Sequence, residues 1–303
     1  MAIEVKSVNG YADLELWVEL RNAGAPDDPE TVEMMALVRA RELYRMDLLA
    51  YLDGEPAGAA FLAGDPASVS ATHPYVDIRV LPALRGRGVG TALVHELAEG
   101  ARRQGKIGFE CAVLTTDGHS LGYVERRGYK PIRTTDQWTL DLGGDVAGFP
   151  PPEGVEICWL AERPELMNKM YAVATEAYPE FGGWVARQTD TMQDWIVYEL
   201  GNPSLPVELT SIAVTPDDEV AGFSTFIVLP DGKTASHRMV AVARPWRGRG
   251  IAKALVSAQL RGAKAAGYQR LVAWRRGPAP DRAFTGLGFE RGHSWTVFVG
   301  PLP

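Results

Sequence analysis

Two short segments of this sequence combine arginine and glycine in a way that suits phosphate binding. Residues 85–90 read Arg-Gly-Arg-Gly-Val-Gly, and residues 247–252 read Arg-Gly-Arg-Gly-Ile-Ala. Each follows an apolar run typical of a strand and precedes a run with the apolar spacing of a helix. The first turn of a helix offers unpaired N–H groups and the positive end of the helix dipole, and glycine lets a phosphate approach the backbone. The segments therefore predict two diphosphate-binding turns.

Two common phosphate motifs do not fit these turns. The P-loop needs Gly-x-x-x-x-Gly-Lys-[Ser/Thr], which occurs at neither segment. The dinucleotide fingerprint Gly-x-Gly-x-x-Gly is interrupted, because Thr91 and Lys253 stand where its third glycine belongs. ATP and NAD are therefore disfavoured. The competing interpretation, that the glycines only form tight strand-to-helix turns, does not explain why Arg-Gly-Arg-Gly occurs twice.

The elements that must position these turns form an internal repeat with an offset of about 160 residues. Residues 48–61 and 209–226 each read as strand, acidic turn and strand, which predicts a β-hairpin in each copy. Each copy later contains Gly-Tyr or Gly-Phe, at 128–129 and 288–289, and then a closing apolar run. The closing runs, 137–140 and 295–298, are expected to be the last strands of their copies. Apolar periodicity predicts helices over 12–21, 31–45, 91–104, 164–177 and 253–266.

The repeat predicts two domains of one class. Residues 143–154 are dense in Gly and Pro, which cannot sustain a helix or a sheet and indicate a linker. We therefore expect an N-terminal domain over residues 1–142 and a C-terminal domain over 155–303. The element order predicts an α/β (α+β) fold, in which each domain has a mixed, mainly antiparallel sheet flanked by helices.

The pattern [Gln/Arg]-x-x-Gly-x-[Gly/Ala] after a strand resembles the acetyl-CoA pyrophosphate motif of the GNAT superfamily of acyl-CoA-dependent N-acyltransferases. The resemblance covers essentially the whole chain and looks like the tandem type of that superfamily, which includes mycothiol-synthase-like enzymes. The residues that fill the motif are Arg85, Gly88 and Gly90 in the first copy, and Arg247, Gly250 and Ala252 in the second.

The resemblance implies acetyl-CoA as co-substrate and indicates the residues that bind it. Backbone amides of residues 86–91 and 248–253 would hold the pyrophosphate, and the strands around Val80 and Val242 would pair with the pantetheine arm. A backbone N–H would stabilise the oxyanion. The candidate cofactor-binding residues are Val80, Arg85, Gly86, Arg87, Gly88, Val89, Gly90, Thr91, Asp117, Val242, Arg247, Gly248, Arg249, Gly250, Ile251, Ala252 and Lys253.

The catalytic positions depart from the family pattern. The family often places a tyrosine four residues before the glycine of the Gly-Phe pair, as the acid that protonates the departing thiolate. This position is Val124 in the first copy, with Tyr123 beside it, and Phe284 in the second. A family asparagine seven residues earlier corresponds to Asp117 in the first copy and Gly277 in the second.

Three further residues are candidates for a general base. His73, Asp77 and His237 lie on or near the strand expected to face the thioester, and histidine suits proton removal near neutral pH. The competing interpretation of each is a surface or strand-end residue without a role. The candidate catalytic residues are therefore Tyr123 as acid, and His73, Asp77 and His237 as bases.

The leading hypothesis is an N-acetyltransferase that moves an acetyl group from acetyl-CoA to the amine of a small molecule by direct attack. Two alternatives stay open. One is a non-catalytic acetyl-CoA-binding module, a sensor or scaffold, which the missing tyrosine suggests. The other is acetylation of a protein or peptide. Tandem relatives typically catalyse with the C-terminal copy, but its downstream motif is the more degraded here, so the active copy is left open.

The composition of the chain disfavours some classes of binding partner. The formal net charge of -7 argues against a broad nucleic-acid surface, since phosphate backbones need clustered Lys and Arg. No run of apolar residues is long enough to span a bilayer, and the beginning of the chain does not read as a secretory signal. The two cysteines, Cys111 and Cys158, lie in apolar runs and fit a reducing cytoplasm. We expect no metal, and a monomer or homodimer.

Overall fold

The computed structural model describes residues 2–25, 29–41, 44–64, 72–181, 191–276 and 282–303. The chain forms two compact units. Unit 1 contains residues 1–135 together with 294–303, and unit 2 contains residues 136–293. Each unit carries one of the two predicted turns.

Unit 1 is built on a mixed sheet in the order β1-β2-β3-β4-β5-β12. Among its described strands, β4 and β5 pair in parallel, and the other neighbours that pair in this unit are antiparallel. Its elements are β1 (Ile3–Ser7), α1 (Gly10–Gly24), α2 (Val32–Arg41), β2 (Arg45–Leu52), β3 (Glu55–Ala63), β4 (Tyr75–Val80), the 3-10 turn Pro82–Leu84, α3 (Val89–Arg103), β5 (Gly108–Leu114), α4 (Gly118–Arg126), the first half of β6 (Lys130–Asp141) and most of β12 (Glu290–Pro301).

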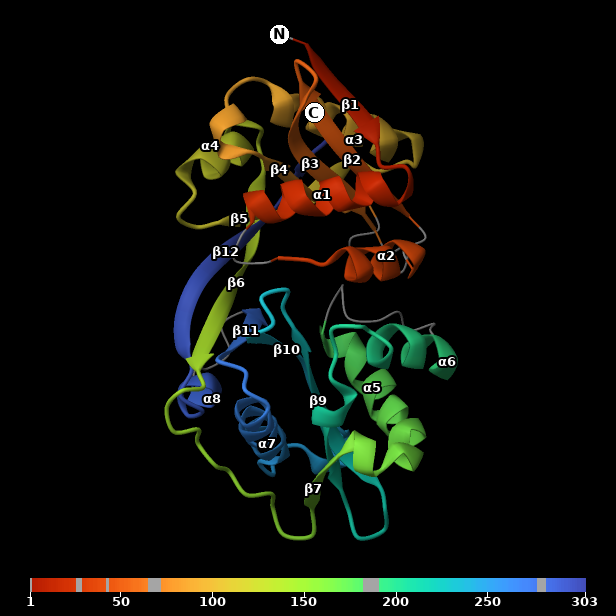
Figure 1. The fold of residues 1–303 in the computed structure, drawn as a ribbon, viewed down its shortest axis with the longest axis vertical. Helices are drawn as coiled ribbons and strands as arrows, with labels where there is room; N and C mark the ends of the chain where they lie inside the picture. The colour runs from red at the N-terminus through yellow and green to blue at the C-terminus, as the bar shows by residue number, and fades with distance from the viewer. Residues whose placement is uncertain (1, 26–28, 42–43, 65–71, 182–190, 277–281) are drawn as a thin grey trace. The chain divides into compact units, whose positions relative to one another are not determined.

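The two faces of this sheet bury different helices, as alternation of side chains along a strand requires. Leu48 and Ala60 belong to the core beneath α3, whereas their neighbours Leu49 and Ala59 belong to the core beneath α1. Trp17 of α1 is buried there, and its indole N–H donates to Ala60 O at 3.0 Å. The sheet of unit 1 is therefore covered by α1 and α3 on opposite sides (Figure 1).

Unit 2 repeats this plan with the order β6-β11-β10-β9-β8-β7. Here β10 and β11 are parallel, and β7 to β10 pair antiparallel in sequence. Its elements are β7 (Glu156–Trp159), 3-10 turns at Leu160–Glu162, Pro164–Leu166, Val207–Leu209 and Arg244–Trp246, α5 (Met167–Phe181), α6 (Met192–Trp195), a π-helical turn (Ile196–Leu200), β8 (Ser211–Val214), β9 (Val220–Val228), β10 (Thr234–Val242), α7 (Ile251–Ala265), β11 (Arg270–Arg276) and α8 (Arg282–Thr285).

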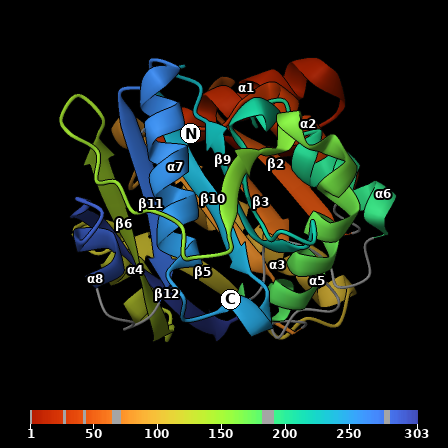
Figure 2. The same cartoon turned by 90° about the horizontal axis from the view of Figure 1, so that it is seen from below.

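Helix α7 runs along β9 and β10 (Figure 2). On the side of the sheet that α7 covers, Leu255 packs with Ala221. Phe223 and Met239 belong to a different core, which the sheet forms with α5. The predicted fold class is thus confirmed: each unit has a mixed, mainly antiparallel sheet with helices on both faces. Among the residues described, no helix has the length and apolar character needed to cross a membrane.

The units do not coincide with the predicted segments 1–142 and 155–303. Residues 294–303 join unit 1, where Trp295–Pro301 pairs with Leu114–Gly108 of β5, and residues 136–142 join unit 2. The closing runs are strands as expected, but the second closes the sheet of the first copy. A period-two pattern specifies which face of a strand is buried and not which of two similar sheets it joins.

The predicted linker 143–154 contains no helix or strand, but it is not a free tether. Val146 and Phe149 pack against the core beneath α7, and Phe149 N donates to Ser257 Oγ at 3.0 Å. Ser257 Oγ in turn donates to Ala147 O at 2.6 Å. These contacts make the segment part of unit 2.

Candidate functional site

The two Gly-rich turns have nearly the same backbone. The φ angles of Gly86 and Gly88 are 75° and 90°, and those of Gly248 and Gly250 are 76° and 87°. Gly88 and Gly250 each occupy the N-cap of a helix in the left-handed region, which favours glycine. Within the described residues, no side chain caps either helix. The first N–H groups of α3 and α7 are therefore unused by side-chain caps, which is the backbone arrangement that a bound anion would need.

The arginine that opens each turn braces the preceding strand. Arg85 Nε donates to Val80 O at 3.2 Å, and Arg247 Nε donates to Val242 O at 2.9 Å. Val89 and Ile251 are buried and anchor the helix, so only their backbone can face a ligand. The arginines thus hold the strand end in place.

Two parallel strands of unit 1 splay apart. β4 pairs with β3 along its length, from Tyr75 to Val80, but pairs with β5 at one position, Tyr75 with Glu110. Beyond that pair the strands separate, and a cavity of about 560 Å³ lies beside them. The cavity extends from the splay to the Gly86–Thr91 turn and α4.

The cavity has an apolar interior and a polar mouth. Val76, Ile78 and Val80 of β4 line it on one side, and Phe109 together with residues 111–114 of β5 lines it on the other. Its polar lining residues are Arg85, Thr91, Asp117, His119, Ser120, Tyr123, Arg126 and Arg127. Of these, His119, Ser120, Arg126 and Arg127 are absent from the residues singled out by sequence. The Arg126-Arg127 pair directly before the Gly-Tyr landmark could have indicated them.

Tyr123 is brought into this cavity by α4. Its hydroxyl is enclosed and has no hydrogen-bond partner in the described part of the chain, although the guanidinium of Arg127 lies 3.6 Å from the ring centre. Burial raises the pKa of the Tyr123 hydroxyl. The nearby Arg127 and Thr91 act in the opposite direction, but Thr91 does not reach hydrogen-bonding geometry. Tyr123 is therefore a neutral O–H donor with an unused proton.

Asp117, at the mouth of the cavity, caps a helix. It is the N-cap of α4, and its carboxylate accepts from Ser120 N at 3.1 Å and from Ser120 Oγ at 2.7 Å. Burial favours the neutral carboxyl, but the Ser120 hydrogen bonds outweigh it and lower the pKa of Asp117. An ionised carboxylate here repels phosphate, so its position suits a helix cap better than a pyrophosphate ligand.

Asp77 and His73 lie apart from the cavity. Asp77 lies on the α1 face of β4, where its carboxylate meets Arg79 Nε at 2.6 Å and Arg21 Nε at 3.8 Å. The side chain of His73 lies against Gly108 at the start of β5, and its Nδ1 is 2.9 Å from Thr72 Oγ1. Neither residue lines the cavity.

In unit 2 the predicted acid position is apolar. The ring of Phe284 stacks on Trp138 with centroids 5.5 Å apart and meets Phe289 edge-on at 5.3 Å. Gly277, the residue of unit 2 at the position of the family asparagine, lies outside the described residues. His237 lies on β10, where Ser224 Oγ is 3.2 Å from its Nε2 and burial lowers the pKa of the imidazole to about 4.

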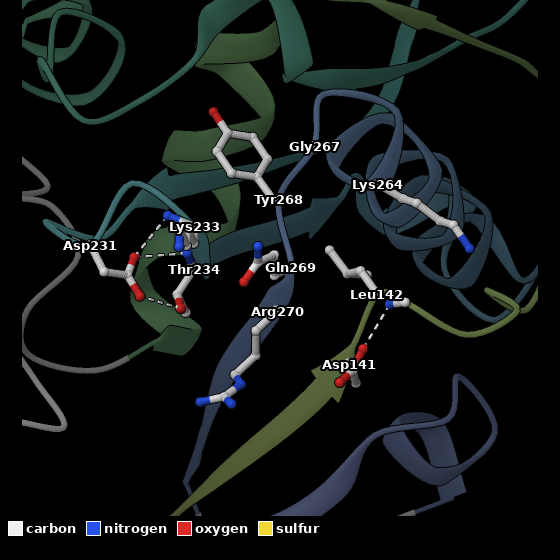
Figure 3. A pocket seen from close by; sticks show the side chains of 11 residues that line it. Asp141, Leu142, Asp231, Lys233, Thr234, Lys264, Gly267, Tyr268, Gln269 and Arg270 are labelled. Atoms are coloured by element: carbon white, nitrogen blue, oxygen red, sulfur yellow. Dashed lines mark hydrogen bonds between the residues drawn. The ribbon is translucent and has the colours of Figure 1, made fainter.

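A second cavity, of about 580 Å³, lies in unit 2 at the opposite end of β10 from the Gly-rich turn (Figure 3). Its two carboxylates serve local turns. Asp231 accepts from Lys233 N at 2.9 Å and Thr234 N at 2.8 Å, and Asp141 accepts from Gly143 N at 2.7 Å. It has no Gly-rich helix start, so the smaller cavity of unit 1 matches the predicted chemistry better. Nowhere among the described residues do three His, Cys, Asp or Glu side chains cluster to hold a metal.

Comparison with known proteins gives one family and many structures. A model of the acetyltransferase (GNAT) family matches residues 14–129 and 167–289. No curated protein matches the chain.

Three solved structures illustrate the likeness. A tandem GNAT protein from the clavulanic acid biosynthesis pathway has a TM-score of 0.79 at 18% identity, covering 100% of this chain and 99% of its own. A GCN5-related N-acetyltransferase from Sphaerobacter thermophilus has a TM-score of 0.72 at 22% identity, covering 99% and 96%. The N-myristoyltransferase of Saccharomyces cerevisiae, solved with myristoyl-CoA, has a TM-score of 0.64 at 13% identity, covering 99% and 79%. At these identities the likeness concerns the fold.

Proposed function

Because the chain belongs to the acetyltransferase (GNAT) family, with a match to the family model in each unit, we propose that it transfers an acetyl group from acetyl-CoA to the amine of a small molecule by direct attack. The observation that carries this proposal is the cavity of unit 1. It joins a helix start with unused N–H groups to an apolar cleft between splayed strands. A diphosphate and a flexible, largely apolar arm would fit these two parts in turn.

The residues around the cavity suit CoA on chemical grounds. The N–H groups after Gly88 would hold the pyrophosphate, and Arg126 and Arg127 at the mouth would balance its charge. Val80 and Ile78 would flank the pantetheine arm. When bound, acetyl-CoA supplies an activated thioester, whose carbonyl carbon the amine attacks. The amine gives up a proton, and the departing sulfur receives one.

We assign the role of proton donor to Tyr123 and catalysis to unit 1. Its hydroxyl is enclosed in the cavity, lacks a partner in the described part of the chain and has a raised pKa, so it keeps its proton at neutral pH. A positioned acid of this kind contributes roughly 100-fold or more to a rate. Phe284, which stands at the family acid position of unit 2, has no proton to give.

The first experiment is a calorimetric titration of the full chain with acetyl-CoA. The wild-type protein is compared with Gly88→Glu and Gly250→Glu, since a carboxylate side chain at either left-handed N-cap would repel the pyrophosphate and strain the backbone. Loss of the site with Gly88→Glu supports the assignment to unit 1. No binding to the wild-type chain would contradict the acetyl-CoA proposal altogether.

A non-catalytic acetyl-CoA-binding module is the second candidate, favoured by Phe284 in unit 2 and by Val124, not tyrosine, at the family position in unit 1. The two candidates differ in turnover. Release of CoA in the presence of a panel of small amines and peptides would exclude the binding module, and its product would identify the acceptor class. Tight binding without CoA release from any of them would favour it.

A further inference from the structure

A buried polar cluster lies between the sheet of unit 2 and α7. It consists of Ser224 on β9, His237 on β10 and Gln259 on α7. Ser224 Oγ donates to Gln259 Oε1 at 2.9 Å, and Gln259 Nε2 donates to Ser224 O at 3.0 Å. Ser224 Oγ is also 3.2 Å from His237 Nε2. Ser224 and Gln259 are fully buried, whereas His237 keeps some accessible surface.

These contacts fix the tautomer of His237. Ser224 O can only accept, so the amide nitrogen of Gln259 must face it, and Gln259 Oε1 then faces Ser224 Oγ. The Ser224 hydroxyl proton is used on Gln259, so Ser224 Oγ must accept from His237 Nε2–H. His237 Nδ1 therefore carries the free lone pair. This Nδ1 atom makes no hydrogen bond within the described part of the chain. It is also not one of the inaccessible, unpartnered polar atoms there, so it can be reached from outside.

The internal repeat shows which residues of unit 1 correspond to this cluster. Gly58 pairs with Val80 in unit 1 and Gly222 pairs with Val242 in unit 2, which aligns the two hairpins. Counting along these ladders, with Arg238 as the extra residue of a bulge, Ser224 corresponds to Ala60 and His237 to Val76. From the N-caps of α3 and α7, Gln259 corresponds to Leu97. Unit 1 thus has an apolar trio where unit 2 has three polar side chains.

The position of Val76 in unit 1 is the inner end of the cavity. It lines the cavity beside the single β4–β5 pair, four residues before Val80 and so about 13 Å from the strand end. If the pyrophosphate is at the turn, the pantetheine arm runs inward and its acyl group reaches this end. This placement of the acyl group rests on the proposed function.

We infer that the two units select different acyl groups. Unit 1 presents Val76 to the acyl end and accepts a plain apolar acyl group. Unit 2 presents the lone pair of His237 Nδ1 and favours an acyl group that donates a hydrogen bond, such as a hydroxyacyl group. Ser224 and Gln259 are positioning residues, because they hold the imidazole with Nδ1 unprotonated.

The test compares butyryl-CoA with 3-hydroxybutyryl-CoA, which differ by one hydroxyl group. It uses the full chain carrying Gly88→Glu, so that calorimetry reports on unit 2. We expect the hydroxyacyl form to bind about ten-fold more tightly, as one hydrogen bond allows. In the reciprocal Gly250→Glu protein, which reports on unit 1, the preference should vanish or reverse.

The repeat supplies a matched variant. Ser224→Ala, His237→Val and Gln259→Leu together copy the trio of unit 1, and should reduce the preference to less than two-fold. If this variant does not fold, as judged by its thermal unfolding, His237→Val and His237→Asn are compared. Asn places an amide oxygen near the Nδ1 position and should keep part of the preference, whereas Val should lose it.

Failure of this inference differs from failure of the proposed function. If free CoA binds the Gly88→Glu protein but both acyl forms bind equally, the selectivity is wrong and the acetyltransferase proposal stands. If CoA binds only when unit 1 is intact, unit 2 holds no acyl donor and the inference is again wrong. If CoA binds no form of the chain, the proposed function itself fails.

Discussion

At the scale of single residues, the surroundings of each side chain in the structure distinguish candidate catalytic residues that the sequence could not rank. Asp77, His73, His237 and Tyr123 were equal candidates by type and position. The structure places only Tyr123 in the cavity of unit 1, because it lies on α4, whereas Asp77 faces α1 and is held between two arginines. Alternation along β4 could have predicted that Asp77 and Val76 face opposite sides. The missing partner of the Tyr123 hydroxyl could not be predicted.

Replacing Tyr123 with phenylalanine should lower kcat about 100-fold, because the departing thiolate loses its proton donor. The acetyl-CoA dissociation constant from calorimetry should stay within about two-fold, since the ring and its contact with Arg127 are kept. Steady-state assays with the acceptor found in the amine panel provide the measurement. An unchanged kcat would remove Tyr123 from the mechanism.

Protonation of His237 should destabilise unit 2 in acid. Its pKa is about 4 when folded and about 6.5 in an unfolded chain, so the unfolded state binds the extra proton between these values. Stability is therefore full above pH 6.5 and falls as the pH is lowered toward 4. Between pH 7.5 and pH 5 the wild-type protein should lose about 2 kcal/mol more than His237→Val in urea unfolding. Parallel profiles for the two proteins would contradict a neutral imidazole at His237 in the folded protein.

At the scale of elements, local signals were sufficient for most of the framework. The Asp53-Gly54 turn has positive φ at both residues, 51° and 90°, which is the two-residue hairpin turn that Asp-Gly favours. The helices predicted after the Gly-rich turns, 91–104 and 253–266, correspond to α3 and α7. The splay of β4 from β5 was not predictable, since separation of two parallel strands depends on tertiary packing and leaves no local pattern.

The left-handed N-cap of α3 can be tested by a small substitution. Gly88→Ala should cost about 1–2 kcal/mol, because an L-residue is strained at a φ of 90° and its Cβ would meet Ile3 Cδ1 at 3.2 Å. Gly118→Ala is the control, since Gly118 has ordinary φ and open space around its Cβ position. Denaturant midpoints measure both. Equal stability of the two variants would mean that the turn tolerates another conformation.

At the scale of the whole chain, unit 1 is not one continuous stretch of sequence, because the last residues of the chain belong to it. The repeat was predictable from the two Arg-Gly-Arg-Gly segments, and so were both closing strands. Their assignment was not, because Gln137–Leu140 and Trp295–Phe298 offer similar alternating faces, and either could complete either sheet. The choice depends on packing at particular points, such as Gly300 of β12 against the ring of Tyr129.

That contact gives a prediction about the cavity of unit 1. A Cβ at Gly300 would overlap the Tyr129 ring, and Tyr129 lines the cavity. Gly300→Val should therefore cost about 1–3 kcal/mol and weaken acetyl-CoA binding to unit 1 while leaving unit 2 unchanged. Gly144→Ala, where no atom lies within 4 Å of the new Cβ, serves as the control. Undisturbed binding at unit 1 would show that Tyr129 can move without closing the cavity.

The late position of β12 in the sequence also bears on how the protein is made. Translation delivers all of residues 136–293 before Ser294–Pro303 leave the ribosome, so unit 2 can close first although its sequence begins later. Until then, β5 of the nascent unit 1 has an edge without the strand that finally pairs with it. The N-terminal half is thus synthesised first and completed last, and a fragment that ends at the predicted linker would leave the ribosome with that edge uncovered by its native partner.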